Sequence, residues 1–260
     1  MGGPSTPDRS GAGAAQGVGF GAAAAGPVLP FGNVHYLSAP LSFFLGLLAL
    51  AFVFAMDFFT NDLRSLPFVR DRLPIAASEL ARNHNRLTVI AWLLILVGLV
   101  AAALFLLWQY MTHANVRTLR PEALRLGPGA AVALWFIPLA NLVLPFLAIR
   151  ALWRASDPDV DLEEPRSPRI TPLFWLWWLA WLTGIGLALA AYLPALGGEL
   201  TAEQLIVRDR IAIAACGAGV VTAILAVVIV QMERGRLILL EDRVRYPHWR
   251  GWTTSRTRPA

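Results

Sequence analysis

Few residues in this chain have the type and spacing needed for catalysis or metal binding. The histidines are His35, His84, His113 and His248. They form no HExxH motif, and no two of them are four residues apart, as a zinc-binding helix requires. Cys216 is the single cysteine, so an internal disulfide is excluded and a cysteine-based zinc site is not expected. We therefore predict no catalytic, cofactor-binding or metal-binding residue, and we do not expect an enzyme.

Polar residues near the ends of apolar runs are the remaining candidates for chemistry. His113, Asn115 and Arg117 follow one such run, and an enzyme would need at least two of them within hydrogen-bonding reach of each other. Asp57 is an acidic residue inside an apolar run, about one turn from its end. At that position a snorkelling or capping role is favoured over proton transfer.

The composition places these residues in a membrane protein. The chain has 260 residues, of which 57% are hydrophobic and 15% are charged, whereas soluble domains carry about 25% charged residues. The excess apolar surface needs lipid to face. All 22 basic residues are arginines, and the net charge is +5. Arginines that flank membrane spans explain this excess, so nucleic acid is not an expected partner.

Five apolar runs are each about as long as a membrane-spanning helix, which needs about 20 residues. They are Leu41–Phe59, Leu87–Tyr110, Ala130–Ile149, Pro172–Tyr192 and Ile211–Val230. We predict an all-α, polytopic transmembrane bundle of five spans, with four spans plus a re-entrant or kinked helix as the alternative. The tryptophans that open the fourth run are typical of an interfacial aromatic belt.

Arginine placement predicts the orientation. With five spans, six arginines fall on one side and sixteen on the other, which puts the C-terminus in the cytoplasm and the N-terminus outside the cell. With four spans the division is fifteen against seven, and both termini are cytoplasmic.

Three regions follow from the pattern. Residues 1–36 are rich in Gly, Ala and Pro and are predicted to be disordered. Residues 37–233 form the transmembrane domain, and residues 234–260 form a basic cytoplasmic tail that contains Arg and Trp. Thr201–Gln204 fits a capping box at the start of the last helix.

The third run is interrupted by Pro138, Asn141 and Pro145. Each proline removes a backbone donor and frees a carbonyl one turn earlier, and in lipid that carbonyl must find a partner within the protein. We expect one face of this segment to point into the bundle, with Asn141 bonded to a neighbouring helix or to a freed carbonyl. The kink serves either for packing or, as in transporters with broken helices, as a cavity wall.

This segment also carries a resemblance. The string from Trp135 to Ser156 resembles the hallmark of a bacterial, largely actinobacterial, membrane family, domain of unknown function 4328. The matching residues are Trp135, Pro138, Asn141, Pro145, Trp153 and Arg154, with Trp108 and Asn115 upstream. The resemblance implies a multi-pass fold. It implies no activity, because the family has no established function.

The expected function is that of a non-enzymatic structural, partner-binding or sensory component of the bacterial cell membrane. The alternative is a small transporter or channel-like protein with a cavity at the Pro138–Asn141–Pro145 kink. A membrane enzyme ranks third. The expected partners are the lipid bilayer and either other membrane proteins or a second copy of the chain, with no cofactor.

Overall fold

Four long helices dominate the fold. The computed structural model describes residues 33–70, 77–159, 171–194 and 201–245, and the regular elements in these ranges are all helical. The long helices are α1 (Asn33–Arg70), α2 (Ala77–Leu119), α5 (Pro172–Tyr192) and α6 (Ala202–Arg245). All four are long and apolar enough to cross a membrane. The predicted class, a polytopic helical membrane bundle, is confirmed.

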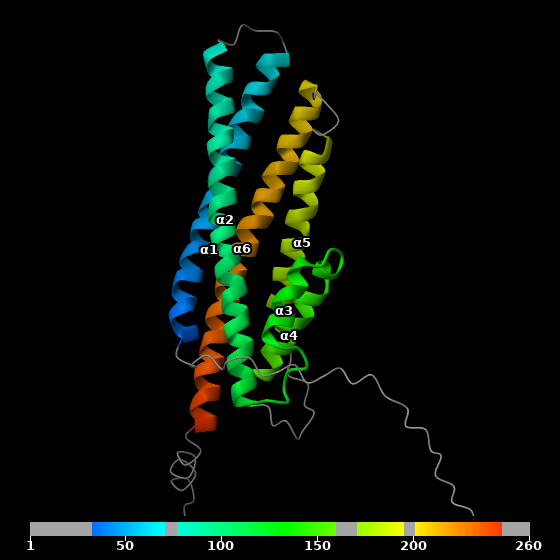
Figure 1. Cartoon of the computed structure of the whole chain (residues 1–260). Coiled ribbons are helices and arrows are strands. Elements are labelled where there is room, and N and C mark those ends of the chain that lie inside the picture. The colour runs from blue at the N-terminus through cyan, green and yellow to red at the C-terminus, as the bar shows by residue number, and fades with distance from the viewer. Residues whose placement is uncertain (1–32, 71–76, 160–170, 195–200, 246–260) are drawn as a thin grey trace, which may run out of the picture.

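The long helices differ in length. Helix α5 has 21 residues, or about 31 Å, which matches a hydrocarbon core of about 30 Å. Helices α2 and α6 have 43 and 44 residues and extend beyond that core. Helix α1 begins and α6 ends at the same end of the bundle (Figure 1). We call this the terminus end, and we call the other the opposite end.

The third apolar run does not cross the bundle. It forms α3 (Pro128–Ala133), two short 3-10 turns, η1 (Leu134–Phe136) and η2 (Ala140–Leu142), and α4 (Leu144–Ala155). The chain enters from the terminus end, turns and returns (Figure 1). We call residues 128–155 the re-entrant hairpin. The expected count of five spans is therefore corrected to four in the described residues, which is the alternative with a re-entrant segment.

The prolines explain why this run breaks. The residue before a proline is pushed out of the helical region, and Ile137, which precedes Pro138, is extended at φ −91° and ψ 113°. Leu139 then adopts a left-handed φ of 63°, which is strained for a residue with a side chain. These two residues, which flank Pro138, reverse the chain in place of a helical turn.

Helix packing in the bundle is uneven. Helix α6 packs along both α1 and α5, and α1 packs along α2, whereas α2 and α5 are not closely packed on each other. Small residues allow the close approaches. A Cβ atom on Gly184 of α5 would lie 3.6 Å from Ala218 Cβ of α6, and one on Gly219 would lie 2.7 Å from the ring of Phe52 on α1.

The predicted capping box opens α6. The backbone N–H of Thr201 donates to Gln204 Oε1 at 2.8 Å, and the N–H of Gln204 donates to Thr201 Oγ1 at 3.3 Å. At the other end α6 continues to Arg245, so residues 234–245 of the predicted tail extend the last helix. Residues 246–260, and residues 1–32 of the predicted N-terminal segment, lie outside the described residues.

Candidate functional site

The entry leg of the re-entrant hairpin is bonded to α2. Trp135 Nε1 donates to Gln109 Oε1 at 2.7 Å, and Gln109 Nε2 donates to the backbone oxygen of Ala131 at 3.4 Å. The Gln109 side chain is fully buried, and a buried amide that lacked these partners would be costly in an apolar layer. One polar residue of α2 thus joins two points of the hairpin.

Trp135 also lies at the centre of an aromatic cluster. Its ring meets Phe105 of α2 and both Trp178 and Trp181 of α5 edge to face, with centroids 5.7 to 5.9 Å apart. Such pairs contribute about 0.5–1.5 kcal/mol each beyond their buried area. Trp177 and Trp178 are buried, so the tryptophans predicted to form an interfacial belt include two that pack inside the bundle.

A tryptophan of α5 satisfies the broken backbone of the hairpin. Trp178 Nε1 donates to the backbone oxygen of Leu142 at 3.1 Å, at the junction between η2 and α4. Next to it, Phe146 of α4 packs against Trp175 and Trp178 with centroids 4.5 and 5.6 Å apart. The break in the helix is therefore matched by a donor and an apolar surface from a neighbouring helix.

The interrupting residues of the third run do not share one buried face. Pro145 is buried at the start of α4, and Pro138 is exposed at the turn. Leu139 is 82% exposed. The Asn141 Oδ1 atom is buried and accepts no hydrogen bond from the residues that the structure describes. Among the described residues, Asn141 Oδ1 therefore receives no hydrogen bond from a neighbouring helix, which was one of the two partners expected for this side chain.

Trp153 and Arg236 connect α4 to α6. The guanidinium of Arg236 lies 3.9 Å from the centre of the Trp153 ring, in the geometry of a cation–π contact. Its Nη2 atom donates to the backbone oxygen of Trp153 at 2.8 Å and pairs with the Asp157 carboxylate at 3.0 Å. Trp153 is thus held by both its ring and its carbonyl.

Two further arginines bind just past the end of α4. Arg120 Nη1 donates to the backbone oxygens of Ala155 and Asp157 at 3.2 and 2.9 Å. Arg243 Nη1 donates to the backbone oxygen of Pro158 at 2.6 Å. Cations are favourable at a helix C-terminus because its carbonyls carry partial negative charge. Both interactions hold the return leg of the hairpin at the terminus end.

Of the three residues considered for an enzyme site, His113 and Arg117 lie on one side of α2 and Asn115 lies on another. Side chains two residues apart on a helix point about 200° away from each other. Asn115 therefore points away from both His113 and Arg117. His113 is buried, and its Nδ1 atom is 3.0 Å from the backbone oxygen of Gln109 on its own helix. Asn115 is buried as well. The helix therefore places Asn115 on a different side from the other two residues.

The remaining candidates, Trp108, Arg154 and Asp57, lie on three different helices. Trp108 is buried against Phe105, with centroids 5.6 Å apart, and Arg154 is half-buried on α4. Asp57 accepts a hydrogen bond from Asn61 Nδ2 at 3.1 Å, one turn along α1. The described parts of the chain contain no group of three or more His, Cys, Asp or Glu residues that could hold a metal ion.

Gln109, Asp209 and Glu233 are buried polar residues that were not among the predicted site residues. Asp209 pairs with Arg208 at 2.6 Å, and Arg208 also lies 3.8 Å from Asp62 of α1. The spacing of apolar residues along α6 was the signal that could have predicted the burial of Asp209 and Glu233. Most buried positions of α6 follow one another at intervals of three, four or seven residues: Asp209, Ala212, Cys216, Ala223, Ala226, Ile229, Val230, Glu233, Leu237 and Leu240. Asp209 and Glu233 belong to this stripe and so face the bundle.

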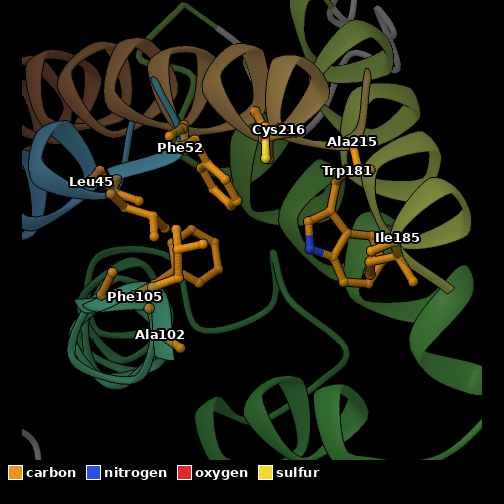
Figure 2. Close-up of a pocket in the computed structure, with 18 of the residues that line it drawn as sticks. Leu45, Phe52, Ala102, Phe105, Trp181, Ile185, Ala215 and Cys216 are labelled. Carbon is orange, nitrogen blue, oxygen red and sulfur yellow. The ribbon is translucent and has the colours of Figure 1, made fainter. Parts of the chain in front are cut away.

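A cavity of about 740 Å³ lies between α1, α2, α5 and α6. Figure 2 shows Phe52 of α1 and Cys216 of α6 on one side of the cavity. Phe105 of α2 and Trp181 of α5 line the other sides. Trp135 and Phe136 of the hairpin also contribute to its wall, whereas Pro138, Asn141 and Pro145 do not. The cavity is thus separate from the kink at which a transport site was anticipated.

These features define a class: a multi-pass helical membrane protein with four candidate spans and a re-entrant hairpin packed against them. A family model described as "Domain of unknown function (DUF4328)" matches residues 71–234. The match covers more than half of the chain, which therefore belongs to this family, and the resemblance noted in the sequence is confirmed. No curated protein and no solved structure matches the chain.

Proposed function

We propose that this protein is a non-enzymatic component of a bacterial cell membrane with a structural, partner-binding or sensory role. The observation that carries the proposal is the use of the family-motif side chains. Trp135 and Trp153 join the hairpin to α2 and α6, and neighbouring groups satisfy its backbone. Catalysis needs a nucleophile or base held near a stabilising group, whereas this arrangement supports a rigid scaffold.

The arginine distribution supports a cytoplasmic position for both termini. With four spans, fifteen arginines belong to the terminus end and seven to the opposite end. The side with more Arg faces the cytoplasm in most membrane proteins. This revises the expectation of an extracytoplasmic N-terminus, which followed from five spans, and keeps the C-terminus inside.

A transporter remains the second candidate, because a cavity of about 740 Å³ lies within the bundle. The location of this cavity changes where a transport site would lie. The Pro138–Asn141–Pro145 kink does not line the cavity, so transport would use the space between the long helices. The mainly apolar side chains around this space favour an apolar cargo over an ion.

Co-purification after cross-linking in intact membranes tests the proposal. The variant Trp135→Leu removes the bond to Gln109 and the central ring of the cluster. Trp92→Leu is the matched control, because Trp92 is 66% exposed on α2. We expect a partner, or a second copy of the chain, to be retained by the wild type and by Trp92→Leu and to be lost with Trp135→Leu.

Reconstituted vesicles provide the contrasting result. Saturable uptake of a solute by vesicles that contain the wild-type chain, above that of protein-free vesicles, would favour the transporter over the proposed role. Retention of no partner by any of the three proteins would contradict partner binding. Gel filtration of each variant in detergent separates loss of a partner from loss of the fold.

A further inference from the structure

The cavity between the long helices has the shape of a slot. Along α5 its wall runs from Trp177 to Tyr192, a rise of about 22 Å at 1.5 Å per residue. Along α2 it runs from Leu87 to Leu106, a rise of about 28 Å. A hydrocarbon core is about 30 Å thick, so the slot is nearly as long as the apolar layer is thick.

The slot exists because α2 and α5 do not pack closely on each other along it. At the terminus end, the re-entrant hairpin fills the space between them, with Trp135 bonded to α2 and Trp178 of α5 bonded to the hairpin. Farther toward the opposite end, side chains of the long helices line an open space instead. Figure 2 shows Ala102 of α2 and Ile185 of α5 facing each other across it.

The chemistry of the wall selects an apolar occupant. The hydroxyl groups on the wall belong to Tyr192 and Thr222, and Thr222 Oγ1 already donates to the backbone oxygen of Ala218 at 2.8 Å. A buried water needs two to four polar partners, which this wall does not supply along its length. An empty space of this size would forfeit packing contacts.

We propose that the slot holds an acyl chain of a bilayer phospholipid, which enters laterally between α2 and α5. Ala102 is exposed and Ile185 is 37% exposed, so the two sides of this gap face the surrounding lipid. The aromatic rings of Phe105, Trp135 and Trp177 close the slot toward the terminus end. The lipid headgroup therefore lies at the opposite end, near Tyr192, where a tyrosine is favoured at the interface.

A photoreactive lipid tests this assignment. The purified full chain is placed in phosphatidylcholine–phosphatidylglycerol vesicles that contain a small share of phospholipid with a diazirine in mid-chain. After illumination, adducts are located by tandem mass spectrometry. We expect adducts on Cys216, which is buried from the outer surface but lines the slot, as well as on the outward-facing Ile224, which is 52% exposed.

Two adjacent alanines of α2 give a matched pair. Ala102 and Ala103 are both exposed, and only Ala102 lines the slot. We expect Ala102→Phe to lower the Cys216 adduct several-fold and to leave the Ile224 adduct unchanged, whereas Ala103→Phe changes neither. If Ala102→Phe does not fold, Ala188→Phe fills the same slot from α5.

Three results would overturn the assignment. Adducts confined to outward-facing residues of the wild type would show that no acyl chain enters. Equal effects of Ala102→Phe and Ala103→Phe would show that Cys216 is reached by another route. Labelling of Cys216 by a diazirine fatty acid but not by the diazirine phospholipid would show that the slot holds a free fatty acid instead of a phospholipid chain.

Discussion

At the scale of single residues, the tryptophans of α5 differ in what their indole N–H groups do. Trp178 donates to the hairpin at Leu142. Trp177 is equally buried, and its Nε1 atom has no hydrogen-bond partner among the described residues. The two side chains have the same size and lie side by side on one helix, so a pair of substitutions separates the hydrogen bond from the buried area.

Replacing Trp178 with Phe should destabilise the protein by about 1 kcal/mol more than replacing Trp177 with Phe. The first change leaves the Leu142 carbonyl without its donor, whereas the second removes a donor that was not used. Hydrogen bonds within membrane proteins contribute about 0.6–2 kcal/mol. Titration with sodium dodecyl sulfate in mixed micelles measures both unfolding free energies, and equal losses would contradict the role given to Trp178.

At the scale of elements, the contact between α1 and α6 depends on Gly219, which has no side chain. A Cβ atom on Gly219 would lie 2.7 Å from the ring of Phe52, which is closer than packed atoms tolerate. Gly217, two residues earlier on the same helix, has nothing within 4 Å of that position. The sequence contains both glycines in one stretch of small residues, and only the packing shows which of them is required.

Gly219→Ala should therefore destabilise the bundle by about 1–3 kcal/mol, as overpacking does. Gly217→Ala should be neutral or stabilising by up to about 1 kcal/mol, because alanine is the better helix former. The same detergent titration provides the measurement. A loss with Gly217→Ala that equals the loss with Gly219→Ala would show that helix propensity or local flexibility decides the effect, and not the Phe52 contact.

At the scale of the whole molecule, the four-span arrangement makes a prediction about topology. A reporter that is active only in the cytoplasm should be active when fused to either end of the chain, because α1 begins and α6 ends at the same end of the bundle (Figure 1). A reporter that is active only outside should be silent in both fusions. If the reporter that works only outside the cell is active when fused to the N-terminus, the result would support five spans instead of four.

Much of the fold follows from the sequence because lipid imposes a simple rule. A helix satisfies its own backbone hydrogen bonds, so a long apolar run in a bilayer becomes a helix. Four of the five runs obey this rule, and the Thr201–Gln204 capping box forms as its spacing predicts. The family was recognisable in the same way, because a resemblance to it depends on residue order alone.

The tertiary structure decided the rest, because it depends on contacts between distant segments. A continuous kinked helix and a re-entrant hairpin have the same composition over residues 130–149, and the partners from α2 and α5, Gln109 and Trp178, support the hairpin. The slot likewise arises where α2 and α5 are not closely packed on each other. The sequence by itself determined that the chain enters the membrane as helices; how those helices pack determined which run turns back and where space for a lipid chain remains.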